Sequence, residues 1–191
     1  MQSMKHWFAP SALLALAACG SGQSTEESAA ATGNVMLRDV SADVVAQQMA
    51  AARKFDPPQG GLWLQKIEVV SLDIKNATDE QRSAVEEQVG KVAREKRSCL
   101  TSEQLLASET GAMGGMANMC KFEKVEMAGG KLNSNFQCTT ADGQSSGTMT
   151  GTSTANSQVF TTVTHSGMGD TDAVFDLTLR VTRRRLGDCE S

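Results

Sequence analysis

The stretch CKFEKVEMAGGKLNSNFQC, residues 120–138, decides the fold. Its two halves alternate apolar and polar side chains, as strands do when one face is buried. Between the halves, Ala128-Gly129-Gly130 is typical of a three-residue hairpin loop that contains glycine. The stretch therefore predicts a β-hairpin with strands at 120–127 and 131–138.

A disulfide between Cys120 and Cys138 follows from this hairpin. With the three-residue loop, Phe122 faces Phe136 and Cys120 faces Cys138, and both pairs lie on the same side of the ribbon. Directly opposed residues bring their Cα atoms to about 4.5–5.5 Å, which is within the reach of a disulfide.

A second disulfide is predicted by elimination. Apart from Cys19, the chain has four cysteines, and an even number in an exported protein indicates two bridges. Once Cys120 pairs with Cys138, Cys99 is left with Cys189. A metal site is the alternative use of these thiols. It is disfavoured because the sequence has no Cys-x-x-Cys pair and, beyond the leader, only one histidine.

The strand pattern continues from the hairpin to the C-terminus. Asp142-Gly143 and Asn156-Ser157 are turn signals, and the segments between and after them are strand-like. These segments are 146–154, 158–166 and 173–186. The last one alternates apolar residues with Asp, Thr and Arg, which predicts a sheet with one solvated face.

Helices dominate the pattern upstream of the hairpin. Residues 41–54 and 78–96 have helical spacing, and Thr101 opens a short third helix. Residues 61–74 have apolar side chains on both faces, which indicates an interior strand or one covered by a helix. The sequence therefore predicts an α+β domain, with an antiparallel β-meander sheet, two or three short flanking helices and two disulfides.

Residues 1–18 are typical of a lipoprotein signal peptide. Lys5 supplies a positive start, and the apolar run that follows is far shorter than the ~20 residues that span a bilayer. The run ends in Leu16-Ala17-Ala18-Cys19, which resembles the bacterial lipobox. We therefore expect lipidation of Cys19. Cleavage at an Ala-x-Ala-like site that leaves Cys19 unmodified is the alternative.

The segment after the anchor predicts a tether. Residues 20–34 are small, polar and acidic, so we expect residues 19–38 to be a lipid-anchored flexible tether and residues 39–191 to form the single folded domain. No Asp directly follows Cys19. By resemblance to enterobacterial sorting, this favours the outer membrane, with the domain facing the periplasm.

Three motifs carry a resemblance to a known family. They are Gly-Leu-Trp at 61–63, Cys-Leu-Thr-Ser-Glu-Gln at 99–104 and Arg-Arg-Leu-Gly-Asp-Cys at 184–189, with a Cys-containing hairpin between the last two. Together they resemble the bacterial exported family called domain of unknown function 3617, over about residues 60–190. The resemblance implies export, disulfides and a small β-rich domain, and it implies no substrate.

Candidate chemistry is sparse, so we expect the protein not to be an enzyme. His165 is the one histidine outside the leader, and no Ser-His-Asp or Cys-His arrangement is evident. Asp170 and Asp172 lack the ligand count of a calcium loop. The basic residues of 180–185 are the typical charges of a solvated strand face or a guarded edge, with attraction to anionic lipid as the alternative.

Methionines offer the alternative site. Met113, Met116 and Met119 recur at every third position, and thioethers are soft ligands that suit copper(I). The same residues also fit a flexible segment that fills gaps over the sheet.

The leading functional hypothesis is a non-enzymatic envelope lipoprotein that acts as a binding or envelope-maintenance module. Its net charge of −4 disfavours nucleic acid as a partner. Its expected partners are the membrane, through the N-terminal lipid, and an envelope protein or a small hydrophobic ligand, with no cofactor. A copper(I)-binding periplasmic protein is the alternative function.

Overall fold

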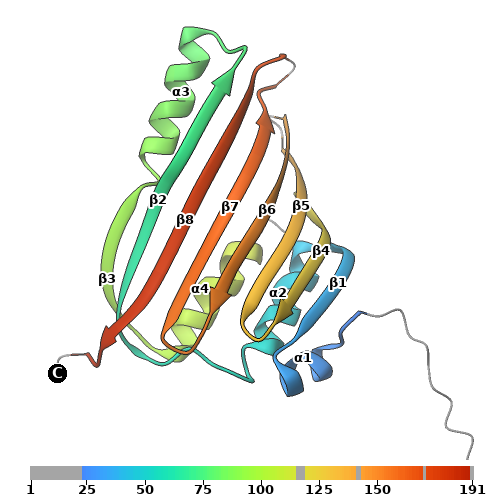
Figure 1. The fold of residues 1–191 in the computed structure, drawn as a ribbon, viewed down its shortest axis with the longest axis vertical. Helices are drawn as coiled ribbons and strands as arrows, with labels where there is room; N and C mark the ends of the chain where they lie inside the picture. The colour runs from blue at the N-terminus through green and yellow to red at the C-terminus, as the bar shows by residue number, and fades with distance from the viewer. Residues whose placement is uncertain (1–22, 115–118, 141–142, 170, 190–191) are drawn as a thin grey trace, which may run out of the picture.

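One antiparallel sheet forms the body of the protein (Figure 1). The computed structural model describes residues 23–114, 119–140, 143–169 and 171–189. The sheet has eight strands in the order β1-β4-β5-β6-β7-β8-β2-β3, so the meander from β4 to β8 is continuous and β2 and β3 extend it on one side. The strands are β1 (Val35–Ser41), β2 (Gly61–Lys75), β3 (Arg94–Leu100), β4 (Cys120–Ala128), β5 (Lys131–Thr140), β6 (Gly143–Ser153), β7 (Ser157–Gly167) and β8 (Val174–Gly187).

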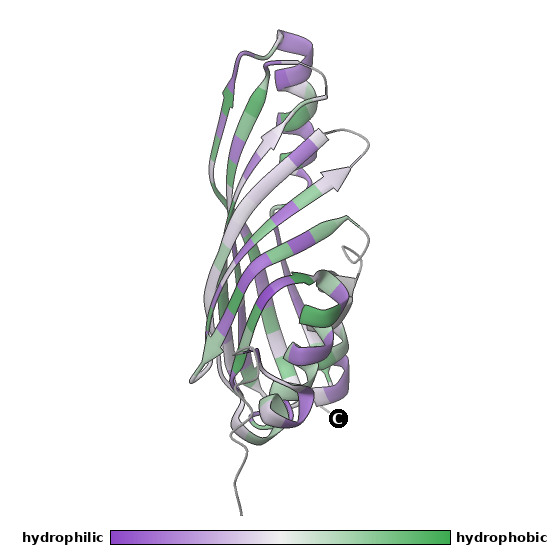
Figure 2. Ribbon diagram, turned by 90° about the vertical axis from the view of Figure 1, so that its right-hand side faces the viewer, coloured by the Kyte–Doolittle hydropathy of each residue, from purple (hydrophilic) through white to green (hydrophobic). Residues whose placement is uncertain are grey.

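The helices lie at the two ends of one sheet face. Figure 2 shows the twisted sheet from its side, with one helix near the top and the others near the bottom on the same side of it. The upper helix is α3, and the lower group flanks the other end. The helices are α1 (Glu26–Thr32), α2 (Ala42–Ala52), α3 (Asp79–Gly90) and α4 (Ser102–Gly114).

Residue alternation separates the two faces of the sheet. In β6 the odd-numbered side chains are half-buried or buried and the even-numbered ones are exposed. The register places Phe136, Met149, Thr162 and Leu179 on the same side as the helices. We call this side the helical face and the other the open face. The predicted α+β class, with an antiparallel meander and one solvated face, is confirmed.

The main hydrophobic core lies between α2 and strands β1, β4 and β5. Leu37, Val45, Phe122 and Val125 are almost completely buried in it. The rings of Phe122 and Phe136 lie 5.9 Å apart between centroids, beside the Cys120–Cys138 bridge. Burying such side chains contributes about 1.5–3 kcal/mol each, so this core is a main source of the stability of the fold.

Both disulfides have the predicted pairing. Cys120 and Cys138 are directly opposed, with Cα atoms 4.0 Å apart, and the Cα atoms of Cys99 and Cys189 are 5.8 Å apart. The predicted loop is wrong by one residue. Ala128 pairs with Lys131, so the turn consists of Gly129 and Gly130 alone. Both have positive φ, which a two-residue hairpin turn requires. A bulge between Phe122 and Lys124 restores the register, and the pairing beyond it is as predicted.

The predicted flexible tether is wrong for residues 26–38. Thr25 caps α1, and Val35 and Leu37 of β1 are buried against the core. The small side chains of α1 are what allow it to pack closely, because Ala29 is fully buried. The folded region therefore begins well before residue 39, and β1 adds an edge strand beside β4.

The predicted helix at 78–96 ends early. The capping box of Thr78 and Gln81 is present, but α3 stops at Gly90 and residues 94–100 form β3. Pairing with β2 outweighs helix propensity here, because β3 satisfies one side of the β2 backbone over residues 61–67. The third helix begins as predicted, with a capping box between Thr101 and Gln104.

Candidate functional site

The helical face carries an apolar trough along β2 and β8. Its side chains come from alternate positions of the two strands and are half-buried, although they are large and apolar. We define the trough by Ile67, Val69, Leu72, Leu177, Leu179 and Val181. No helix of the described chain crosses the middle of this face (Figure 2).

A bulge in β2 assembles the trough. Val69 pairs with Leu179 and Leu72 pairs with Leu177, so Val70 is an extra residue between them. Simple alternation would put positions 69 and 72 on opposite faces. The bulge brings both to the helical face and turns Val70 out, where it is exposed.

Helix α3 covers the upper end of the trough. A cavity of about 420 Å³ that is largely open to solvent lies between the helix and the sheet. Its lining is apolar except for Gln88, and consists of Ala84, Val85, Gln88, Val89, Val92, Phe175 and Leu177. Val89 is buried there, whereas Val85 and Val92 are only half-buried. The helix thus contacts the sheet through a narrow line of valines.

Aromatic rings extend the floor beside the trough. Phe160 of β7 pairs with Val181 and lies next to Gly151 of β6. A Cβ at Gly151 would lie 2.4 Å from the Phe160 ring, so only glycine allows the ring to lie there. Gly147 similarly admits the ring of Phe136.

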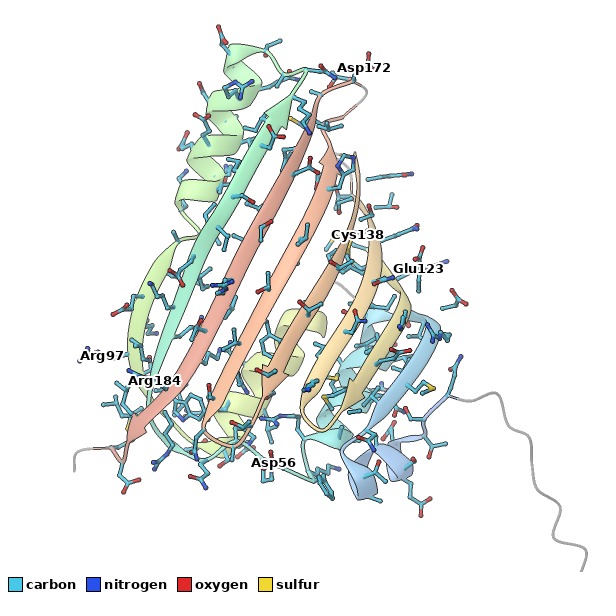
Figure 3. The ribbon with its side chains drawn as sticks, viewed as in Figure 1. Asp56, Arg97, Glu123, Cys138, Asp172 and Arg184 are labelled. Carbon is cyan, nitrogen blue, oxygen red and sulfur yellow. A yellow bond between two sulfur atoms is a disulfide. The ribbon has the colours of Figure 1, made fainter. Side chains whose placement is uncertain are left out.

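Basic residues lie at the lower end of the trough. Arg94 and Lys96 of the edge strand β3 pair with Ile67 and Gln65, which puts both side chains on the helical face. Both are exposed, and neither has an ion-pair partner among the described residues. Arg97 lies on the opposite face in register with Leu64 and Arg184, at the lower corner labelled in Figure 3.

The predicted basic cluster of 180–185 is divided between the two faces. Arg180 and Arg184 are exposed on the open face, whereas Arg183 and Arg185 lie half-buried on the helical face. Arg183 donates to Ser108 Oγ of α4 at 3.2 Å. The expectation of a guarded edge is wrong for β8, because this strand lies inside the sheet. The edge strand on this side of the sheet is β3, and its exposed charges disfavour pairing with a strand of another chain.

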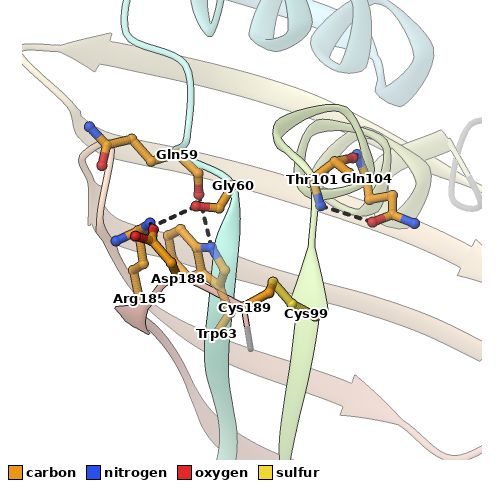
Figure 4. Close-up of a disulfide and its surroundings, with 9 residues drawn as sticks. All are labelled: Gln59, Gly60, Trp63, Cys99, Thr101, Gln104, Arg185, Asp188 and Cys189. Atoms are coloured by element: carbon orange, nitrogen blue, oxygen red, sulfur yellow. Dashed lines mark hydrogen bonds and ion pairs between the residues drawn. A yellow bond between two sulfur atoms is a disulfide. The ribbon is translucent and has the colours of Figure 1, made fainter. Parts of the chain in front are cut away.

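The three family motifs meet at one corner and hold it together (Figure 4). Trp63 Nε1 donates to the Gln59 carbonyl at 2.9 Å, and Arg185 Nε donates to the Gly60 carbonyl at 2.7 Å. The Cys99–Cys189 bridge joins β3 to the C-terminal segment beside them. Each motif therefore supplies structural contacts, and we call this corner the clasp.

A polar network lies on the upper part of the open face. His165 Nδ1 and Asp176 Oδ1 are 2.7 Å apart, and Lys75 forms ion pairs with Asp73 and Asp176. An ionised carboxylate only accepts, so Nδ1 donates. The hydrogen bond from His165, aided by Lys75, lowers the pKa of Asp176. The same aspartates raise the pKa of Lys75. Sequence reasoning missed this network because only the β7–β8 and β2–β8 registers bring its members together.

This network does not have the geometry of a hydrolase site. Ser146 is the cross-strand neighbour of His165, so a serine, a histidine and an aspartate lie in one row. Within the described residues, however, no hydrogen bond joins Ser146 to the imidazole. The backbone amides here belong to the sheet ladder, so they are not free to stabilise an oxyanion.

The remaining predicted site residues lie mostly outside the described residues. This applies to Cys19, Met116, Asp170 and the turn residue Asp142, and to the side chain of Met113. Met119 is described and is 44% exposed at the start of β4. The copper(I) site therefore stays a prediction, which copper(I) titration of a variant lacking all three methionines would test. No group of three His, Cys, Asp or Glu side chains suited to a metal occurs in the described part of the chain.

Fold and cysteine pairing define a disulfide-stapled α+β domain built on a single antiparallel sheet. Among the described helices, none combines the length and apolar character needed to cross a membrane. Residues 58–189 match the model of the family described as protein of unknown function (DUF3617), and the chain belongs to that family. Comparison with curated proteins and with solved structures gave no match.

Proposed function

We propose that this protein is a lipid-anchored envelope lipoprotein that faces the periplasm and binds a small hydrophobic ligand in the apolar trough. In this proposal it is a binding module without catalytic activity, held to the outer membrane through Cys19. The observation that carries the ligand-binding function is the row of half-buried apolar side chains on β2 and β8, together with the cavity beneath α3.

The trough supports binding because its surface is incompletely covered. Leaving apolar area in water costs about 25 cal/mol per Å², so a ligand that covers these side chains gains free energy. The cavity of about 420 Å³ is of the size that small ligands occupy, and its lining is mostly apolar. The core between α2 and β4, in contrast, consists of side chains that are almost completely buried.

The envelope location rests on three sequence features. Residues 1–18 have the signal-peptide pattern, Cys19 lies where a lipobox cysteine would, and the four other cysteines form two bridges that suit an oxidising compartment. Metabolic labelling of cells with a radioactive fatty acid tests the anchor. We expect label on the wild-type chain and none on Cys19→Ala; equal labelling of both would refute the anchor.

Binding of an environment-sensitive apolar dye tests the trough. We would use the mature chain from residue 19 with Cys19→Ala, which carries no lipid of its own. Leu179→Ser removes apolar area from the trough and should weaken dye binding about tenfold. Val163→Ser is the matched control, because this residue is 46% exposed on the open face, and it should leave binding unchanged.

Two further results give this test a clear outcome. Leu179→Met keeps an apolar side chain and should bind the dye as the wild type does, which shows that the loss in Leu179→Ser is not a folding defect. The melting temperature of each variant checks the same point. Absence of dye binding by the wild type, or equal loss in Val163→Ser, would contradict the proposal.

A further inference from the structure

We propose that the ligand of the trough is a single anionic amphiphile, with its acyl chain along β2 and β8 and its anionic head at Arg94 and Lys96. This inference rests on the proposed ligand-binding function and adds the chemical class and orientation of the ligand. It follows from the polarity of the two ends of the trough.

The upper end of the trough is mostly apolar and lies beneath α3. Ile74 is buried there, its cross-strand partner Phe175 lines the cavity, and Val85 and Val89 of α3 lie above them. A charged group placed among these side chains would lose its hydration, which is costly, and the guanidinium of Arg82 beside them already donates to the Ile74 carbonyl at 3.3 Å. The chain end of an amphiphile, which has no charge, suits this end.

The lower end of the trough is basic and open to solvent. Arg94 lies beside Ile67, at the end of the apolar row, and Lys96 lies beside Gln65, one row further down. Arg183 occupies the same row as Lys96, across β2. The two β3 side chains have no ion pair within the described residues, so an anionic group meets two cations without displacing a carboxylate.

Within the described chain, no acidic residue of β2, β3 or β8 lies on the helical face. Glu95 and Glu68 are on the open face, in register with Lys66 and Arg180. On α3, Glu87 pairs with Lys91 at 2.7 Å. The charged strand residues that the register places on the helical face at this end, Arg94, Lys96 and Arg183, are therefore all positive, although the whole chain carries −4.

The shape of the trough favours one extended chain over a bilayer or a protein. From Ile67 to Ile74 the strand spans about 20 Å, allowing for the bulge, at about 3.3 Å per residue. The trough is about two strands wide, and helices flank it at both ends (Figure 2). A flat bilayer surface cannot reach its floor between these helices, whereas a single acyl chain can.

Three ligands with the same chain and different heads test the proposal. Dodecanoate, dodecanol and dodecyltrimethylammonium, each below its micelle concentration, would displace the apolar dye from the mature Cys19→Ala chain. We expect dodecanoate to bind about tenfold more tightly than dodecanol, because two exposed charge contacts add to the shared apolar term. The cation should bind most weakly, and added salt should reduce only the advantage of dodecanoate.

Variants of β3 test whether Arg94 and Lys96 bind the anionic head of the ligand. Arg94→Gln with Lys96→Gln should lower dodecanoate affinity to that of dodecanol, and Arg94→Glu with Lys96→Glu should favour the cation. Arg97→Gln is the control, since it removes a charge from the same strand on the open face. These residues are exposed on an edge, so folding should persist, and melting temperature checks this.

The outcomes separate this inference from the proposed function. Equal affinity for all three ligands would overturn the anionic amphiphile while leaving apolar binding intact. A loss of selectivity in Arg97→Gln as large as that in the double variant would overturn it as well. If the dye binds and none of the three ligands displaces it, the anionic amphiphile is overturned as well. If the dye itself does not bind, ligand binding in the trough is refuted as a whole.

Discussion

Arg185 of β8 donates a hydrogen bond to the carbonyl oxygen of Gly60 over 2.7 Å, and this contact closes the clasp between the two ends of the family region. The two residues lie 125 positions apart in the chain. The backbone between them approaches closely: a Cβ at Gly61, where φ is +141°, would lie 2.4 Å from the Gly187 carbonyl. Glycine at position 61 is therefore a requirement of the clasp.

Gly61→Ala should destabilise the protein by about 2 kcal/mol or more. The cost combines a backbone conformation that L-residues rarely adopt with a collision against backbone rather than a movable side chain. Gly90→Ala is the matched control. A Cβ there meets nothing within 4 Å and the residue ends α3, so this variant should be neutral or more stable by about 0.5–1 kcal/mol. Urea unfolding measures both, and equal stabilities would contradict the prediction.

The two disulfides should differ in accessibility and in stabilisation. Cys99 and Cys189 are exposed, whereas Cys120 and Cys138 are buried, so mild reductant should open the first bridge before the second. Alkylation of the freed thiols followed by mass spectrometry determines the order in which the two bridges are reduced. By chain entropy, removing Cys99–Cys189 should cost about 4–5 kcal/mol and removing Cys120–Cys138 about 3 kcal/mol. Simultaneous reduction of both would argue against this difference.

The open-face network should make stability depend on pH. His165 and Lys75 hold the pKa of Asp176 below its ordinary 3.8. The folded state therefore gains stability that is present above about pH 3.8 and is lost as the pH falls through the folded-state pKa of Asp176. Asp176→Asn lacks this contribution. The difference in free energy of unfolding between wild type and Asp176→Asn should shrink below pH 3.8.

His165→Ala provides the internal comparison for that titration. It removes the largest cause of the pKa shift and leaves the 3.5 Å contact from Lys75 to Asp176, so its pH dependence should fall between those of the wild type and Asp176→Asn. Chemical denaturation at pH steps from 2.5 to 6 measures all three proteins. Parallel curves for the three would show that the network does not contribute.

The N-terminal segment should protect the outer edge of β1. Ser24 Oγ accepts from the Met36 amide at 3.0 Å, and the Ser24 amide donates to the Met36 carbonyl at 2.9 Å. Ser24→Ala removes the first bond, and a loss of about 1 kcal/mol should speed exchange of the Met36 amide about fivefold. Hydrogen exchange by NMR measures this. Unchanged protection of Met36 would mean that the segment does not hold the edge.

The sequence predicts strands well where the two faces differ in polarity. The hairpin at 120–138 and the strand at 173–186 alternate apolar and polar side chains, so the buried face of each follows directly, as does the pairing within the hairpin. The segment 94–97 has four charged residues in a row and no such contrast. Its strand conformation comes from the unsatisfied backbone of β2, which no local pattern reveals.

Bulges explain why the trough could not be predicted. In β2 the apolar residues occupy both odd and even positions, a pattern that predicts a strand buried on both faces. The extra residue at Val70 instead puts Val69 and Leu72 on one face. The bulge at Glu123 similarly compensates for the shorter turn at Gly129 and Gly130, so two local errors cancel at the cysteines. Composition gives no indication of where such an extra residue lies.

The attachment of Gln23 and Ser24 to β1 would limit where a protein lipidated at Cys19 can act. Only residues 20–22 separate these positions from Cys19, so a lipid at that cysteine would keep the first fixed residue within about 14 Å of it. So short a connection would confine the lipidated protein to the layer of solution next to its own leaflet. Cargo bound for an opposing membrane would have to be passed to a separate, diffusing carrier.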